Sequence, residues 1–553
     1  MVAAIASAQS MVYLEQSETL NFDEQRLPDA QILKGNVRFR HEDALMFCDS
    51  AYFYEKTNSL DAFGHVRMIQ GDTLFGYGDV LYYNGNTKLA RLRKHVRLVH
   101  KATTLRTDSL NYDRARDIAY YFRGGTIEDS LNVLKSVWGQ YIPSTKQATF
   151  RHEVQLTNPN FILTSDTLLY NTETKIANLV SPTSIVYEEE TTILSSNGWY
   201  NTETEHSLLL DRSHVIHQDG KTMTGDSIFY DKQIGFGRII GNMEVVDSAQ
   251  HVTLYGNYGE VYEENEQELS HGFATDSALM VDWSDEDSYM YVHADSLFTE
   301  QIPFVCAIDS ATEVDSAYNR VRAYHGVRVY KEDVQAVCDS MVYRELDSLM
   351  VLYTLPVCWS DSNQMSADSI HIQMKNDEVD FIHGMGSAIC IQQKTEEYFN
   401  QMSGKEMFAY VREGELRQVD VNGNAETVFY PEDEGTGDFI GMNVTESSYV
   451  KIFLENQQIH HVLFTTQTTG TLYPLDQIPT GKDRLTGFFW AEQERPLKPG
   501  DVFLKPERTP WPGSTVKSAV SVEPTTEEGE GGEEGEKQPK KGNNRMSNRK
   551  LTR

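Results

Sequence analysis

An aspartate recurs along the chain inside one six-residue pattern: a small residue, Asp, Ser/Thr/Val, an apolar residue, any residue and an aromatic residue. Full copies are Cys48–Phe53, Gly78–Tyr83, Thr107–Tyr112, Ser165–Tyr170, Gly225–Tyr230 and Cys338–Tyr343. A ladder of carboxylates could bind calcium or supply acid catalysis. The GGxGxD pattern of calcium-binding β-rolls is missing, however, and Asp followed by Ser or Thr is a turn former. We therefore expect the aspartates to mark a corner between two strands of each repeat.

No other motif points to catalysis. The sequence contains no nucleophile elbow, no HExxH and no phosphate-binding loop, and its 16 His residues are scattered. The five Cys residues lie far apart, without metal-ligand spacing. They are expected to be buried free thiols, although a disulfide such as Cys338–Cys358 remains open in an oxidising compartment. We expect a protein without enzymatic activity, metal or cofactor.

The spacing of the copies defines a repeat. Asp49 and Asp79 are 30 positions apart, and both Asp79–Asp108 and Asp339–Asp368 are 29 apart. Around each Asp, apolar residues alternate with a period of two, as in a half-buried strand. A period near 29 residues with strand patterning alone predicts an all-β array of stacked units, none of which buries its apolar face by itself.

Composition supports an all-β protein and excludes two functional classes. The 29 Tyr and 24 Phe residues among short Val, Ile and Thr runs favour strands. A formal net charge of −33 argues against a nucleic-acid partner, because phosphate backbones need a basic footprint. No apolar run approaches the roughly 20 residues that span a bilayer as a helix.

The register of the repeats divides the 553 residues into segments. Ala6, Ser7 and Ala8 have the form of a signal-peptidase site, although the apolar run before them is short and no basic residue precedes it. The Glu-, Gly- and then Lys/Arg-rich end of the chain lacks the side chains that offset ordering. The expected segments are a clipped signal-peptide remnant over 1–11, a first array over 12–272, a looser β connection over 273–323, a second array over 324–464, an irregular Pro-containing segment over 465–513 and a disordered tail over 514–553.

One repeat combines a Gly-x-Val strand start, a small residue followed by Asp, and an Ala-x-Gly close, in Gly35–Phe39, Cys48–Ala51 and Leu60–Gly64, and this pattern recurs over most of residues 30–370. The pattern resembles that of the OstA-like family of lipopolysaccharide-transport proteins in Gram-negative bacteria. The second half, from His325–Tyr330 to Thr486–Trp490, resembles the long OstA-like proteins of the Bacteroidetes. The resemblance implies a twisted β-jellyroll, or β-taco, in the periplasm, whose two sheets enclose a groove for acyl chains. It also implies lipopolysaccharide as ligand and other jellyrolls of the transport bridge as partners, joined end to end by β-strand addition.

In such a stack the positions two and four after each Asp should point inward. The first row is Ala51, Leu81, Leu110, Leu168, Ile228 and Met341, and the second is Phe53, Tyr83, Tyr112, Tyr170, Tyr230 and Tyr343. Acyl chains along these rows would gain on the order of 0.8 kcal/mol per buried methylene. The alternative is that the same rows fill a closed core.

A basic cluster stands against the acidic background, from Lys88 to Lys101. Arg91, Arg93, Lys94 and Arg97 could meet lipid A phosphates at a groove edge, or they could lie on a solvated outer face. Three rival functions remain: an adhesin, a carbohydrate-active β-solenoid, and a scaffold for outer-membrane assembly.

Overall fold

The computed structural model describes residues 10–187, 190–263, 269–285, 288–305, 314–375, 378–412, 415–433, 435–455 and 458–505. The chain divides into two compact units, 1–516 and 517–553, and all the described residues belong to the first. The predicted tail, most of the predicted signal remnant and Cys306 lie outside the described residues.

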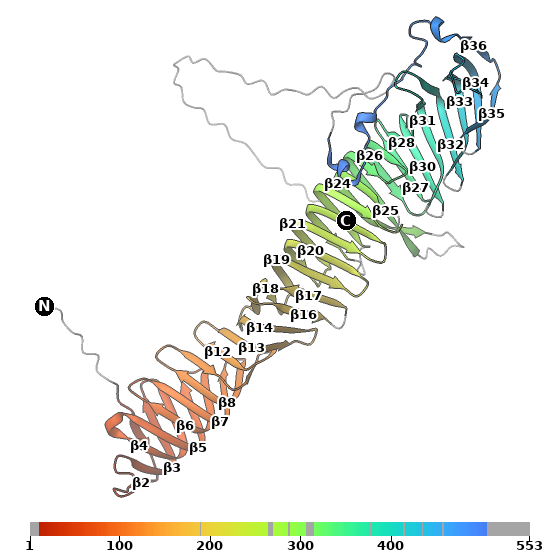
Figure 1. The fold of residues 1–553 in the computed structure, drawn as a ribbon. Coiled ribbons are helices and arrows are strands. Elements are labelled where there is room, and N and C mark those ends of the chain that lie inside the picture. The colour runs from red at the N-terminus through yellow and green to blue at the C-terminus, as the bar shows by residue number, and fades with distance from the viewer. Residues whose placement is uncertain are drawn as a thin grey trace, which may run out of the picture. The chain divides into compact units, whose positions relative to one another are not determined.

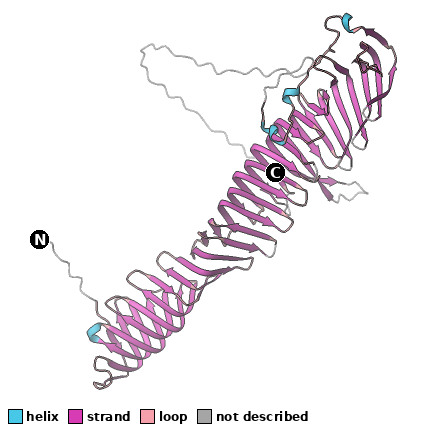
Figure 2. Cartoon of the chain, in the orientation of Figure 1, coloured by secondary structure: helices cyan, strands magenta, loops and turns pink. Residues whose placement is uncertain are grey.

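The described residues form strands and short 3-10 turns (Figures 1 and 2). The strands of the first array are β1 (Tyr13–Gln16), β2 (Thr19–Phe22), β3 (Gln31–His41), β4 (Ala44–Tyr54), β5 (Ser59–Gln70), β6 (Leu74–Asn84), β7 (Leu89–His100), β8 (Thr103–Asp113), β9 (Ile118–Tyr121), β10 (Gly125–Glu128), β11 (Val133–Ser136), β12 (Trp138–Ile142), β13 (Gln147–Thr157), β14 (Phe161–Asn171), β15 (Ile176–Leu179), β16 (Thr183–Tyr187), β17 (Thr191–Ser195), β18 (Asn197–Asn201), β19 (His206–His217), β20 (Lys221–Asp231), β21 (Phe236–Asp247) and β22 (Val252–Tyr262).

The ladder continues without a break into the second array. Its strands are β23 (His271–Asp282), β24 (Met290–Val305), β25 (Val314–Tyr330), β26 (Gln335–Arg344), β27 (Leu349–Tyr353), β28 (Val357–Ser360), β29 (Asn363–Ser366), β30 (Ser369–Lys375), β31 (Glu378–Gln393), β32 (Phe399–Arg412), β33 (Glu415–Phe429), β34 (Met442–Glu455), β35 (Gln458–Thr465) and β36 (Thr469–Tyr473). The 3-10 turns are η1 (Glu55–Thr57), η2 (Leu475–Gln477), η3 (Glu492–Glu494) and η4 (Pro499–Phe503). Every strand pair in these ranges is antiparallel, and the predicted all-β repeat fold is confirmed.

A bend crosses the middle of each long strand and separates two walls. β13 shows this directly, because residues 147–151 pair with β12 whereas residues 155–157 pair with β11. We call first wall the half-strands on the side of β1, β10, β11, β16, β17, β28, β29 and β36. The second wall comprises the half-strands on the side of β2, β9, β12, β15, β18, β27, β30 and β35.

The repeated Asp lies at this bend, inside a strand, and not between two strands as the sequence suggested. Asp49 is in the middle of β4, where pairing with β5 shifts register between Phe47 and Ser50. On β5, Gly64 and His65 take positive φ angles of 75° and 42°, and the His65 ring lies 2.7 Å from the Asp49 carboxylate. The Asp49 carboxylate therefore contacts a side chain of the neighbouring strand across the bulge, and does not cap a turn in its own strand.

One hydrophobic core runs between the walls, from Val12 to Ile452. Two smaller clusters lie on the outer face of the first wall, where residues 474–505 run back from β32 toward β24. Three hydrogen bonds hold this return segment on the wall. The Leu485 N–H donates to the Gln401 side chain, the Ala491 N–H to the Gln364 side chain, and the Arg495 guanidinium to the Gln335 side chain. The domain boundaries drawn from the sequence stay a prediction, since one ladder passes through them. No helix in the described ranges is long and apolar enough to cross a membrane.

Candidate functional site

The interior between the walls contains the predicted inward rows. All six residues of the first row are at most 1% exposed. In the second row Phe53 and the tyrosines through Tyr230 are buried, whereas Tyr343 of the second array is only partly buried. The period-2 alternation thus placed these side chains on the correct face, and whether they contact lipid stays a prediction.

Tyrosine hydroxyl groups close the first array along the rim, the edge of the walls opposite the bend. Tyr83 OH lies 2.6 Å from the His41 ring, Tyr141 OH lies 2.9 Å from His100, and Tyr170 OH donates to Asp129 at 2.7 Å. In each pair the tyrosine belongs to the second wall and its partner to the end of a first-wall strand. Further members of the row are Tyr112 with Gln70, Tyr200 with Tyr187, and Tyr230 with Glu263, which also contacts His217.

These rim networks are buried and well paired. Arg114, with 2% of its side chain exposed, donates to Tyr83 OH at 2.7 Å and to Asp43 at 2.6 Å. Burial raises the pKa of Tyr170, and the Asp129 carboxylate raises it further. Burial also opposes ionisation of Asp129, but hydrogen bonds from Leu131 N–H, Lys175 and Tyr170 outweigh it and leave the pKa of Asp129 lowered. At neutral pH the rim therefore holds charged groups whose partners are in place, which makes separation of the walls costly there.

The second array differs at the same rim. Its inner face carries the partly buried side chains Met374, Val379, Ile382, Leu416, Leu454, Val462 and Phe464. On the facing wall Cys358, Met365, Cys390 and Met402 form one cross-strand row. Methionine is flexible and polarizable, so a lining of this kind can adapt to irregular apolar ligands.

The four predicted phosphate contacts are not brought together. Arg91 pairs across to Asn111 on the second wall, whereas Arg97 pairs across to Arg106 on the first wall, and the bend at Lys94 and His95 separates them. Arg93 is held by the carbonyl groups of Leu92 and Leu110 and by the Asn111 side chain, and burial lowers its pKa. Lys94 lies exposed at the bend itself.

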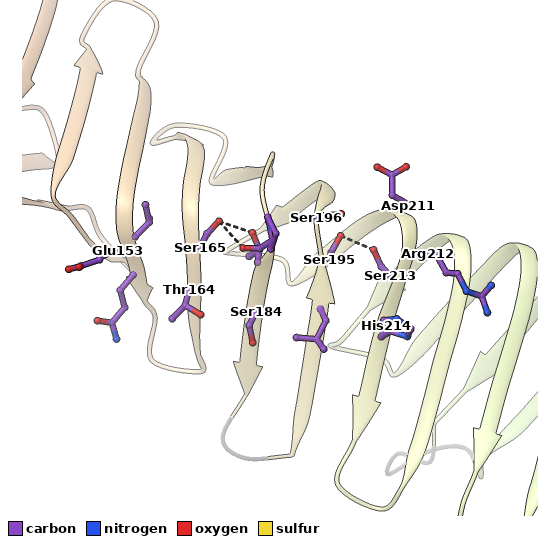
Figure 3. Close-up of a pocket in the computed structure, with 15 residues that line it drawn as sticks. Glu153, Thr164, Ser165, Ser184, Ser195, Ser196, Asp211, Arg212, Ser213 and His214 are labelled. Carbon is purple, nitrogen blue, oxygen red and sulfur yellow. Dashed lines mark hydrogen bonds between the residues drawn. The ribbon is translucent and has the colours of Figure 1, made fainter.

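Two open hollows lie on the first wall and reach to the bend, and the sequence did not predict either. The larger, of about 850 Å³, is rich in hydroxyl groups from β13 to β19 (Figure 3). Ser165 Oγ lies 2.9 Å from Thr183 Oγ1, and Ser213 Oγ lies 2.8 Å from Ser195 Oγ. The second hollow, of about 530 Å³, contains Arg97, Arg106 and Arg123. Only the cross-strand register, which joins residues far apart in sequence, assembles these surfaces.

The described cysteines, Cys48, Cys338, Cys358 and Cys390, are free thiols, so the alternative Cys338–Cys358 disulfide is absent. Within the described ranges no group of three or more His, Cys, Asp or Glu side chains could hold a metal ion.

Residues 9–166 match the family model described as OstA-like protein, which confirms the resemblance predicted from the repeat. The likeness of the second half to the Bacteroidetes members stays a prediction. No curated protein matches the chain. Among solved structures, LptH from Pseudomonas aeruginosa, described as the LptA-homologous periplasmic component of the conserved lipopolysaccharide transport device, covers 26% of this chain and 96% of its own. At 12% identity and a TM-score of 0.21, that likeness carries no argument about this chain.

Proposed function

We propose that this chain is a periplasmic lipopolysaccharide-binding protein that shields acyl chains between its two walls during outer-membrane assembly. The observation that carries the proposal is one continuous apolar interior running through an OstA-like array. Burial of each methylene would contribute on the order of 0.8 kcal/mol at many near-equal positions. Such an interior can pass a lipid along without a single deep trap.

The second array is the better place for the acyl chains. In the first array the tyrosine rim ties the walls together, and Leu168 and Tyr170 are buried against neighbouring side chains. In the second array Ile382, Leu416 and Val462 are packed against the core but remain partly open to solvent. We expect a lipid to enter there, and to occupy the first array only if the rim separates.

Both ends of the ladder suit partners that add strands. Strands β1 and β2 pair only with β3, and β35 and β36 pair only with β34, within the described residues. Tyr13, Phe22 and Leu472 on these edges are all more than half exposed. Unpaired edges with apolar side chains are templates for strand addition, so other jellyroll proteins of the bridge would join here.

In-cell photo-crosslinking tests the proposal. A photoreactive residue would replace Ile382, which lines the interior, or its neighbour Phe381, whose side chain points to the opposite face of the same strand. We expect lipopolysaccharide adducts at position 382 and none at 381. A third variant at Leu168 reports whether the first array opens. Folded, exported protein without an adduct at 382 or 168 would refute lipid carriage.

The closed first array favours one alternative function. An interior filled by its own side chains and fastened at the rim is what a rigid scaffold for assembly partners needs. Crosslinks to proteins at the exposed edge strands, without lipid adducts inside, would favour the scaffold.

A further inference from the structure

An arginine strip crosses the outer face of the first wall in the first array. Arg38, Phe47, Arg67, Tyr77, Arg97 and Arg106 are successive cross-strand partners from β3 to β8. The guanidinium of Arg67 lies 4.7 Å from the centre of the Phe47 ring, and that of Arg97 lies 4.3 Å from the Tyr77 ring. Cation–π contacts hold both side chains flat on the sheet.

The strip is cationic on a chain whose net charge is −33. Glu15 pairs with Arg38, and Glu128 with Arg106 at 3.3 Å. Within the described part of the chain, no carboxylate lies within 4 Å of the guanidinium of Arg97 or Arg123. The guanidinium groups of Arg97 and Arg123 are therefore open to an external anion, although the protein is rich in carboxylates.

The smaller hollow gathers these groups. Arg97 comes from β7, Arg106 from β8, and Arg123 from the segment between β9 and β10, and all three are exposed. Asp108 and His95 also line the hollow. The His95 ring already has a partner there, because its Nδ1 lies 2.8 Å from the Asp79 carboxylate. The arginine fork matches phosphoryl oxygens in a bidentate geometry that lysine does not reproduce. The hollow therefore presents three arginines, from three elements, of the kind that binds a phosphoryl group.

The same cross-strand row leads to the larger hollow. From Arg106 it passes through Thr126, Lys135 and Gln155, and then continues as Thr164, Ser184, Leu194 and His214. At about 5 Å per strand, the arginines and Ser184 lie roughly 25 Å apart along one surface. The exposed hydroxyl group of Thr164 and the half-exposed one of Ser184 suit a polyol, whose hydroxyls exchange hydrogen bonds with Ser and Thr.

We propose that a saccharide bearing phosphoryl groups binds along this strip, with a phosphoryl group between Arg97, Arg106 and Arg123 and sugar residues over the hydroxyl-lined hollow. The site lies on the outer face, so it does not depend on lipid entering the interior. Its ligand could be the head of a glycolipid or a free phosphorylated glycan, since the recognised chemistry is the same.

The test uses the full chain and an acyl-free probe, the phosphorylated core oligosaccharide released from lipopolysaccharide by mild acid. Binding is measured by calorimetry for the chain, for Arg97→Gln/Arg123→Gln and for Thr164→Val. Matched controls are Arg91→Gln, an exposed arginine of the same strand on the other wall, and Thr149→Val, a threonine on the outer face of the second wall. We expect at least about tenfold weaker binding for each arginine removed, a smaller loss for Thr164→Val, and wild-type affinity for both controls.

Further probes show which part of the oligosaccharide is recognised, and whether the ligand is a free glycan or the head of a glycolipid. If the dephosphorylated oligosaccharide fails to bind and inorganic phosphate does not compete, the phosphorylated saccharide is the ligand, and intact lipopolysaccharide then shows whether a glycolipid head binds equally well. Equal binding of inorganic phosphate alone would reduce the site to an adventitious anion site and overturn the proposal. It would also be overturned if Arg91→Gln weakened binding as much as the double variant, or if no probe bound. Because the probe has no acyl chain, failure here leaves the crosslinking test of lipid carriage unaffected.

Discussion

The tyrosine rim makes a prediction that Tyr170→Phe can test. In the wild-type chain Tyr170 OH donates to Asp129 at 2.7 Å and accepts from Asn132 Nδ2 at 2.8 Å. The substitution removes a hydrogen bond to a buried carboxylate, which contributes about 1.5–3 kcal/mol, and a neutral bond that contributes about 1 kcal/mol. Lys175 at 2.9 Å and two backbone N–H groups continue to hold Asp129. The expected local loss is therefore about 3 kcal/mol.

Hydrogen exchange is the suitable assay, because repeat arrays open locally and a single unfolding transition need not report one rim. The amides of Leu131 and Asn132 donate to the Asp129 side chain, and a loss of about 3 kcal/mol corresponds to exchange roughly a hundredfold faster. Tyr82→Phe is the control, since Tyr82 is 42% exposed on the outer face, and it should change exchange by less than about threefold. If Tyr170→Phe also stayed within threefold, the rim would not fasten the walls.

Four shorter predictions concern the rim, the buried thiols, the bend and the return segment. Because the folded pKa of Asp129 is lowered from 3.8, its stabilising effect is complete above about pH 4 and disappears as the pH falls through the folded value; the stability advantage of the wild type over Asp129→Asn, measured by urea unfolding, should shrink in that acid range. Burial raises the pKa of Cys48 and Cys358 to about 12, so iodoacetamide followed by peptide mass spectrometry should label them only after denaturation. Gly64→Ala should destabilise the chain by about 1 kcal/mol or more in urea unfolding, since φ at Gly64 is +75°, a conformation that L side chains rarely adopt. Gln364→Leu removes the partner of Ala491 N–H and of Trp359 Nε1, so limited proteolysis should cut the return segment faster while the arrays stay intact.

The sequence predicted which side chains of a strand face the interior, because that depends only on the period of the strand. Alternation with a period of two assigned Leu81, Leu168 and Ile228 to the interior, and their burial requires only that the strands form. It did not predict the hydroxyl partners at the rim, because Tyr83 and His41 are 42 positions apart and meet only when the walls are stacked in register. A local pattern contains no information about such a partner.

The sequence did not predict where the basic cluster and the return segment lie in the fold, for two different reasons. Arg91 and Arg97 look like neighbours on one strand, but the bulge between Arg93 and Val96 turns the strand from one wall to the other. The return segment has no periodicity, and its contacts with Gln364 and Gln335 join residues 127 and 160 positions apart. In both places the structure depends on a break in the repeat or on contacts with residues outside it.

One repeat position differs between most repeats of the first array and the repeat that follows Asp368 in the second. The aromatic residue four places after the Asp ends on the second wall at the rim, and in the first array a polar side chain from the first wall meets its hydroxyl, as His41 meets Tyr83 and Asp129 meets Tyr170. After Asp368 the same position is Ile372, which has no hydroxyl to offer, and its neighbours Met374 and Ile382 are partly exposed. In this repeat the side chain at one position therefore leaves the rim without a hydroxyl group, although the strand Ser369–Lys375 forms as in the other repeats. If the walls open to admit a lipid, we therefore expect them to open first beside Ile372, in the second array.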